Sequence, residues 1–301
     1  MGCRMNGWID THVHVDNQNK DGSLRPNLLN ELLRVLDEFG ADLRLVMSPD
    51  GRWMDLARNE PDGAHRANEF IHGLTIGARD RLYGSCFINP NFPDESLKTM
   101  EICFEQWGFV QLGEMLQYML GFRMAGDAAC RLVRRAAEYG VPVQVHISTS
   151  NTRTHPSSFG REQLLDLFEC VQHVPEAKYI LAHAVGGAKD NPPVVEEYLD
   201  LIEKEYGRWP ENFWMEIADF RSPGVKLALK RVPVSRLISG TDWNTRVGPP
   251  FLPYGVVFGA TERHAGDYGA AALMKWLRSA GADDDAVRCI GFQNAAELLK
   301  I

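Results

Sequence analysis

Residues 8–14 read WIDTHVH, an apolar segment that ends in two histidines spaced two apart. In a β-strand, side chains at positions i and i+2 point to the same face. A strand here therefore presents His12 and His14 side by side, in position to bind one metal ion. Because many solvated loops also contain such a pair, its meaning depends on the other ligands that the fold would bring to it.

Apolar, β-rich runs recur along the whole chain, and each ends in polar residues. Several are almost continuously apolar, which is typical of parallel strands that are covered on both faces. The eight predicted strands are 8–13, 43–47, 82–88, 109–113, 141–147, 179–184, 213–217 and 237–239.

Segments with apolar residues at three-and-four spacing lie between these runs and predict helices. Three of them stop at Gly40, Gly108 and Gly140, and glycine is a common residue at helix C-caps. The predicted helices are 27–39, 93–107, 128–139, 161–171, 193–206 and 224–229. A long loop is expected over 48–64, after the second strand. It would fold as a lid over the mouth at which the strands end.

Repeated strand–helix units favour an α/β protein with the (β/α)8 TIM-barrel fold, for which about 250 residues is typical. No change in composition marks a second domain, so residues 1–301 are expected to form one barrel domain with a C-terminal helical extension from about 264. A doubly wound open sheet is the alternative. That fold normally has a glycine-rich loop after its first strand, where this chain has His-Val-His.

Metal-ligating residue types stand where the predicted strands end. Glu114 lies 100 residues after His14, His146 follows after 32 more, His183 after 37 and Asp242 after 59. Since one barrel unit spans roughly 30 residues, these intervals correspond to three units, one, one and two. Four histidines and two carboxylates are therefore expected to converge on the carboxyl-terminal mouth of the barrel, where barrel active sites lie.

Composition narrows the classes of function. The 45% hydrophobic and 24% charged residues are ordinary for a globular protein, and no stretch is long and apolar enough to predict a membrane span. The formal net charge of −8 argues against nucleic acid as a partner. Six scattered cysteines without a C-x-x-C motif favour reduced thiols and a cytoplasmic location. The helical C-terminal tail is long enough to support a homodimer.

With these motifs in view, the chain resembles the amidohydrolase superfamily of metal-dependent hydrolases, over its whole length. The segments 9–14 (IDTHVH), 181–183 (LAH) and 239–243 (SGTDW) are similar to the amidohydrolase-related branch, as is the ending 294–299 (NAAELL). That branch contains lactone hydrolases and non-oxidative decarboxylases of the aminocarboxymuconate-semialdehyde and resorcylate type.

The resemblance implies a role for each strand-end residue. His12, His14 and His146 would be metal ligands, and His183 would be a second-site ligand or a catalytic histidine. Asp242 would be both a ligand and the group that transfers a proton. Many amidohydrolases carry a carboxylated lysine on the fourth strand, whereas this chain has a glutamate.

Glu114 resembles the metal-bridging glutamate of TatD-type hydrolases and brings a second metal within reach. A residue that only orients a ligand histidine is the alternative for this position. Imidazole and carboxylate ligands suit Zn²⁺, the first choice, and also Mn²⁺, Fe²⁺ or Co²⁺, as one or two ions.

The expected activity is metal-dependent hydrolysis of a small carboxylated lactone, ester or amide, with water activated by the metal and its proton accepted by Asp242. Decarboxylation of a small aromatic or muconate-like acid is the alternative. A TatD-type nuclease fits less well, because the acidic chain has no basic stripe for phosphates.

An anionic substrate is expected because several arginines follow predicted strands, and arginine binds carboxylates bidentately. Two aromatic residues are expected to form a wall of the pocket. These predicted substrate-binding residues are Arg123, Arg153, Arg221, Arg246, Trp243 and Tyr118.

Overall fold

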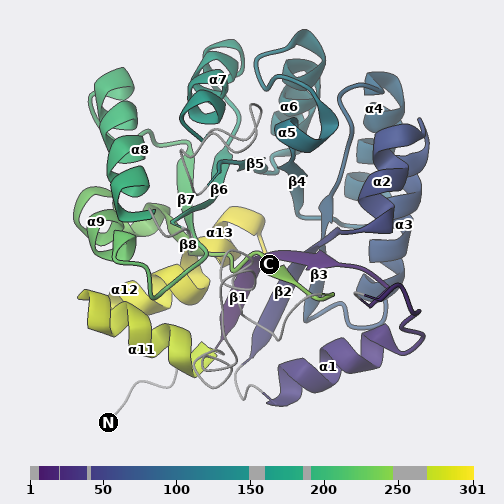
Figure 1. Cartoon of the computed structure of the whole chain (residues 1–301), viewed down its shortest axis with the longest axis horizontal. Coiled ribbons are helices and arrows are strands. Elements are labelled where there is room, and N and C mark those ends of the chain that lie inside the picture. The colour runs from purple at the N-terminus through teal and green to yellow at the C-terminus, as the bar shows by residue number, and fades with distance from the viewer. Residues whose placement is uncertain (1–6, 20, 39–41, 149–159, 186–190, 247–269) are drawn as a thin grey trace.

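Nine parallel strands form one sheet, in the order β8-β7-β6-β5-β4-β3-β2-β1-β9 (Figure 1). The computed structural model describes residues 7–19, 21–38, 42–148, 160–185, 191–246 and 270–301. The strands are β1 (Trp8–Val15), β2 (Leu43–Pro49), β3 (Leu82–Cys86), β4 (Gln111–Met115), β5 (Val143–His146), β6 (Tyr179–Val185), β7 (Phe213–Ile217), β8 (Leu237–Ser239) and β9 (Trp243–Asn244). All eight residues of β1 are buried, as expected for a strand that is covered on both faces.

The two ends of this sheet meet at β1. Strand β9 follows β8 closely in the sequence and pairs with β1, with Val13 opposite Trp243. The Trp8 indole also donates a hydrogen bond of 2.8 Å to the hydroxyl oxygen of Ser239 at the end of β8. The chain therefore forms the predicted (β/α)8 TIM barrel.

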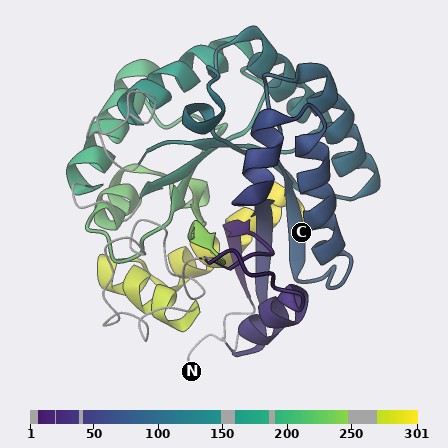
Figure 2. The same ribbon diagram turned by 45° about the vertical axis from the view of Figure 1, so that its right-hand side comes forward.

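Most helices surround this sheet on its outer side, whereas the last one packs across the amino ends of the strands (Figure 2). They are α1 (Leu28–Glu38), α2 (Arg52–Asn59), α3 (Gly63–Thr75), α4 (Pro93–Glu101), η1 (Ile102–Gln106), α5 (Gln117–Leu120), α6 (Asp127–Tyr139), α7 (Gly160–His173), α8 (Asn191–Tyr206), α9 (Gly224–Arg231), η3 (Val234–Arg236), α11 (Ala270–Ala280), α12 (Asp284–Arg288), η5 (Cys289–Gln293) and α13 (Asn294–Leu299). None of the helices in the described part of the chain is both long and apolar enough to cross a membrane.

The eight predicted strands are all present, and the predicted helix over 128–139 ends as expected, because Gly140 has the left-handed φ of 69°. The prediction of a long loop over 48–64 was wrong. Its centre forms α2, which packs Met54 and Ala57 inward at a spacing of three. The predicted start of the C-terminal extension, near 264, lies outside the described residues, and the tail that follows them is helical from α11 onward.

The inside of the barrel is layered along the strand direction. Near the amino ends of the strands, an apolar cluster packs against α13; its core residues are Ile9, Val46, Ile180, Trp214, Ile238, Ala295, Leu298 and Leu299. Further along, buried polar side chains follow, among them Gln111, Gln144 and Glu216. These polar groups lie between the apolar floor and the carboxyl-terminal mouth, so they support whatever the mouth contains.

Candidate metal centre

Six side chains from five places in the barrel meet at its carboxyl-terminal mouth. All six were predicted to converge here, and their carboxylate oxygens and imidazole nitrogens lie within hydrogen-bonding or ion-pair distance of one another. They are His12 and His14 of β1, Glu114 of β4, His146 of β5, His183 of β6 and Asp242 between β8 and β9.

The two histidines of β1 turn the same nitrogen atom toward the site. The Nε2 atoms of His12 and His14 lie 3.0 Å apart. Each ring is held from behind through its other nitrogen, since His12 Nδ1 lies 2.8 Å from Glu216 Oε1 and His14 Nδ1 lies 3.0 Å from the Ser48 hydroxyl. Both Nε2 atoms are therefore directed into the mouth.

Glu114 lies between two pairs of histidines and is only 2% exposed. Its Oε2 is 3.5 Å from His12 Nε2 and 3.3 Å from His14 Nε2. Its Oε1 is 2.8 Å from His146 Nδ1 and 3.0 Å from His183 Nε2. Each carboxylate oxygen thus faces a different histidine pair.

The residue before Glu114 allows this placement. Gly113 has a φ of 132°, and a Cβ added to it would lie 2.6 Å from the backbone oxygen of Gln144 in β5. Only glycine fits this approach of two strands without strain. The close approach carries Glu114 toward the histidines of β5 and β6.

Asp242 completes the side of the site that faces β1. Its Oδ1 is 3.3 Å from His14 Nε2 and 3.6 Å from His12 Nε2, and its side chain is 16% exposed. Asp242 and His183 both have positive φ angles, of 54° and 38°. Such backbone is unfavourable for residues other than glycine and persists where the surroundings impose it, often at functional sites.

The charges of this buried cluster are strongly coupled. Burial alone would lower the pKa of His12, but the carboxylates of Glu216, Glu114 and Asp242 raise it well above its usual value. Burial likewise opposes ionisation of Glu114, yet the nearby His12 and His146 hold its pKa well below the usual range. Glu114 is thus in its charged form and requires positive charge beside it.

The donor set fits a transition metal. Two overlapping groups, His12–His14–Glu114 and Glu114–His146–His183, each place their ligand atoms within 4.8 Å of one another. Imidazole nitrogen and carboxylate oxygen are ligands that Zn²⁺, Mn²⁺, Fe²⁺ and Co²⁺ accept. The buried carboxylates also supply the negative charge that a divalent cation would neutralise.

One residue at the site was missed in the sequence. Glu216 of β7 is fully buried, contacts His12 and accepts a hydrogen bond of 2.9 Å from the backbone N–H of His183. The available signal was an acidic residue inside the otherwise apolar strand FWMEI. Its importance depends on a partner more than 200 residues away, and sequence spacing does not reveal that contact.

A cavity of about 100 Å³ opens beside these residues and is lined by five of the six, all except His12. Its remaining wall combines the apolar side chains of Met54, Leu116 and Met119 with the polar side chains of Asp50 and Asn244. Tyr118 lines it as predicted, and its ring centroid lies 4.6 Å from that of His146.

The other predicted substrate residues do not line this cavity, as far as the structure describes them. Arg246 lies behind the cavity wall, because its Nε is 3.6 Å from Oδ2 of Asp50, and Asp50 lines the cavity. Arg221 lies 3.3 Å from Asp219, and Trp243 is 3% exposed within the main core. Arg153 lies outside the described residues.

Arg123 was expected to face the mouth, and the structure places it elsewhere. Its guanidinium binds Asp166 at 2.7 Å and Glu169 at 2.6 Å, and its side chain is 66% exposed. Two carboxylates of the neighbouring helix α7 therefore hold it on the outer surface, away from the cavity.

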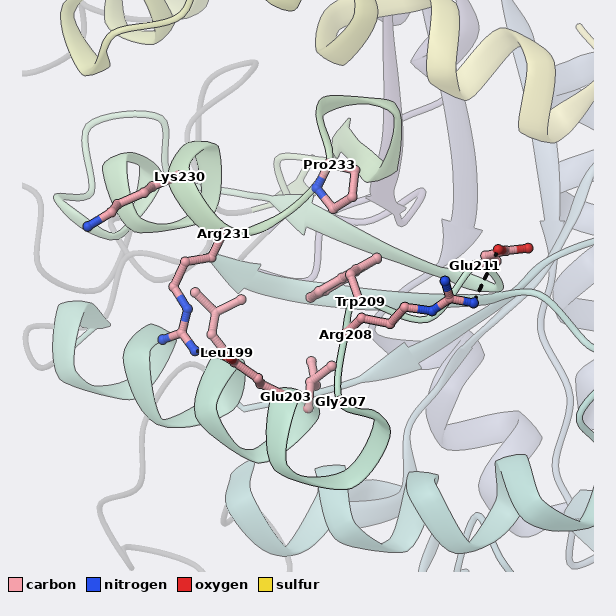
Figure 3. A pocket seen from close by; sticks show the side chains of 10 residues that line it. Leu199, Glu203, Gly207, Arg208, Trp209, Glu211, Lys230, Arg231 and Pro233 are labelled. Atoms are coloured by element: carbon pink, nitrogen blue, oxygen red, sulfur yellow. Dashed lines mark hydrogen bonds and ion pairs between the residues drawn. The ribbon is translucent and has the colours of Figure 1, made fainter.

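A larger hollow of about 740 Å³ lies at the opposite end of the barrel, beside the segments that lead into β7 and β8 (Figure 3). Four of its five charged residues are paired with each other: Arg231 binds Glu203 at 2.6 Å, and Arg208 lies 3.6 Å from Glu211. No histidine or cysteine is among its described lining residues. The metal-ligating chemistry is therefore at the smaller cavity.

Comparisons with known proteins agree with this geometry. A family model described as amidohydrolase matches residues 9–301, whereas no curated protein matches the chain significantly.

Solved structures share the fold over nearly the whole chain. A 4-oxalomesaconate hydratase from Rhodopseudomonas palustris is 15% identical, with 97% of this chain and 95% of that chain covered and a TM-score of 0.70. A dihydroxybenzoic acid decarboxylase from Polaromonas sp. JS666, with bound manganese and 2-nitroresorcinol, is 18% identical, with 98% and 97% covered and a TM-score of 0.66. A probable 2-pyrone-4,6-dicarboxylic acid hydrolase from Acinetobacter baumannii, with bound citric acid, is 16% identical, with 99% and 100% covered and a TM-score of 0.57.

Proposed function

The chain belongs to the amidohydrolase family, and from that membership we propose that it is a metal-dependent hydrolase of a small carboxylated lactone, ester or amide. The observation that carries the proposal is the placement of Glu114, whose two oxygens face two different histidine pairs. A carboxylate in this position suits a pair of metal ions, and paired ions are a common arrangement in hydrolytic enzymes.

The six residues would hold the metals in two halves that share Glu114. His12, His14 and Asp242 would contribute to one half, and His146 and His183 to the other. Zinc is our first choice, and manganese is supported by the solved decarboxylase that contains it. When bound, the metals would supply Lewis acidity that activates water and polarises the substrate carbonyl.

Asp242 is the residue best placed to move the proton. It lines the cavity, and its carboxylate oxygen lies beside both histidines of β1. The neighbouring histidines His12 and His14 hold its pKa below the usual value although burial opposes this, so the group is a carboxylate, the form that can accept a proton. It would take the proton from water and deliver it to the leaving oxygen or nitrogen. His183, at the same cavity, is the second candidate for a catalytic contact with substrate.

Decarboxylation is the second candidate. It is favoured by the solved decarboxylase of a hydroxylated benzoic acid, which shares the fold from end to end. It would use the same residues with one metal, to bind the substrate carboxylate and a neighbouring oxygen.

One experiment separates the two reactions. The protein is loaded with zinc or manganese, its metal content is measured, and a panel of carboxylated lactones, esters, amides and hydroxybenzoic acids is assayed for ring opening and for CO₂ release. We expect ring opening or amide cleavage with two metals bound. In Asp242→Asn the rate should fall by about 10²- to 10⁴-fold, the range of general acid–base catalysis.

The matched control is Asp55→Asn, because Asp55 is an exposed carboxylate of α2. Release of CO₂ with a single metal would replace hydrolysis by decarboxylation. Full activity in Asp242→Asn would reject Asp242 as the proton carrier, and a protein that takes up no transition metal would contradict both reactions.

A further inference from the structure

Glu216 is a fully buried carboxylate in β7 that does not line the cavity. Its Oε1 lies 2.8 Å from His12 Nδ1 and accepts the backbone N–H of His183 at 2.9 Å. One oxygen atom therefore touches a residue from each half of the site, because His12 faces Glu114 Oε2 and His183 faces Glu114 Oε1.

This contact selects the form of His12 that can bind a metal. A carboxylate only accepts hydrogen bonds, so the proton of the neutral His12 ring lies on Nδ1. Nε2, which is directed at His14 and Glu114, is then free of a proton and able to act as a ligand. At His183 the same oxygen anchors the backbone where φ is 38°, a conformation that needs outside support.

Glu216 is itself held firmly in place. Its Oε2 accepts a hydrogen bond of 2.7 Å from the Gln144 amide, and Gln144 Oε1 accepts one of 2.9 Å from the Gln111 amide. Gly240 packs against it, since an added Cβ would lie 2.4 Å from the Glu216 Cδ. The carboxylate thus has little freedom to leave its two partners.

We propose that Glu216 is a positioning residue for both halves of the metal centre, acting through the ring of His12 and the backbone of His183. The inference rests on the proposed function, because it takes the six residues to be a two-metal site. It predicts that loss of the Glu216 acceptor lowers the affinity for both metals, although Glu216 itself binds neither.

The first test is the Glu216→Gln variant, studied by Co²⁺ titration against a competing chelator. An amide at this position offers one acceptor and one donor group. Either its NH₂ faces the two N–H groups of His12 and His183, or it faces the NH₂ of Gln144. In each orientation two hydrogen-bond donors face each other. The side chain at position 216 is therefore a poorer acceptor for His12 and His183 than the native carboxylate. We expect both binding steps to weaken, each by about 10- to 100-fold, with a changed visible absorption spectrum of the bound Co²⁺.

A double variant, Glu216→Gln with Gln144→Glu, separates positioning from folding. In this exchange the new amide can donate to the carboxylate moved to position 144, and its carbonyl oxygen can accept from His12 and His183. All hydrogen bonds are restored with the same groups. We expect the affinities and the Co²⁺ spectrum to return most of the way to those of the native protein, even if Glu216→Gln alone fails to fold.

The matched control is Ser48→Ala, which removes the hydroxyl that supports His14 alone. It should weaken only the step that includes His14. The inference is overturned if Glu216→Gln binds both metals as the native protein does, if it weakens only one step, or if the folded double variant stays weak. A native protein that binds no Co²⁺ would instead contradict the proposed function.

Discussion

At the residue scale, we expect Glu114 to determine how many metals the site can hold. It is the one side chain of the cluster whose two oxygens contact both histidine pairs. In Glu114→Gln one of these oxygens becomes an NH₂ group, which cannot bind a metal. We therefore expect the metal content to fall from two ions to one, with a loss of turnover of about 10²-fold or more.

Metal analysis of the dialysed protein and a steady-state assay measure the two effects. Glu101→Gln, a change at an exposed carboxylate of α4, is the control and should retain both metals. If Glu114→Gln also kept two ions, Glu114 would not be the shared ligand, and orienting a ligand histidine would become its role.

Arg246 is an arginine that lies beside the cavity wall. Its Nε is 3.6 Å from the cavity residue Asp50, and its side chain is 34% exposed. A charged hydrogen bond to a substrate carboxylate contributes about 1.5–3 kcal/mol, so Arg246→Gln should lower kcat/KM by about 10- to 100-fold for a carboxylated substrate.

Arg123→Gln is the matched comparison, because that arginine binds Asp166 and Glu169 on the outside of the barrel. It should leave kcat/KM unchanged. Equal effects of the two substitutions in the steady-state assay would remove Arg246 from the substrate site.

At the scale of elements, one side chain adds hydrogen bonds to the apolar contacts that hold α13 on the barrel. The amide of Asn294 donates to the backbone oxygens of Val234 and Leu237, both at 2.7 Å, and the residue is 8% exposed. In Asn294→Ala both carbonyl groups lose this donor. We expect the free energy of unfolding to fall by about 1–3 kcal/mol, which urea denaturation measures.

Glu297→Ala is the control on the same helix, because Glu297 is exposed and alanine favours the helix. Its unfolding midpoint should stay close to that of the native protein. An Asn294→Ala midpoint equal to the control would mean that the two hydrogen bonds add no net stability.

The strands could be predicted from the sequence because burial on both faces leaves a direct mark, a short run of apolar residues. The convergence of the six candidate ligands could be predicted because parallel strands of a barrel end at one rim, so regular spacing implies proximity. Helix α2 escaped prediction because its buried stripe is only two residues, Met54 and Ala57. A stripe of that length is too short to distinguish a helix from a loop.

The partners of individual side chains could not be predicted, because the spacing of residues along the sequence does not indicate them. Arg123 was expected at the mouth because it follows β4, but two carboxylates of α7 pair with it outside. Glu216 was overlooked because its partners His12 and Gln144 come from other strands. In both cases the deciding contact joins residues that are distant in sequence, and their charges become meaningful only when the barrel is formed.

At the scale of the whole molecule, the candidate metal centre joins strands from both ends of the chain. Its six residues come from β1, β4, β5, β6 and the segment before β9, and the pair β1–β9 is also where the sheet closes. Binding to the folded state alone adds stability as RT ln(1 + [L]/Kd), about 4 kcal/mol at a free metal concentration 1,000 times the Kd. Removal of metal with a chelator should therefore lower the melting temperature by several degrees, and added Zn²⁺ or Mn²⁺ should restore it.

Calorimetry of the native protein and of His14→Ala, each with and without metal, tests this expectation. The variant lacks a ligand that contacts both Glu114 and Asp242, so most of the metal-dependent increase in melting temperature should disappear. Ca²⁺ serves as the control ion, because it prefers six to eight oxygen ligands and this site offers mainly imidazole nitrogen. If the melting temperature does not change with Zn²⁺ or Mn²⁺, or if it rises equally with Ca²⁺, these strand ends do not form a transition-metal site. In that case the buried carboxylates of Glu114 and Asp242 would be balanced by protonated histidines alone.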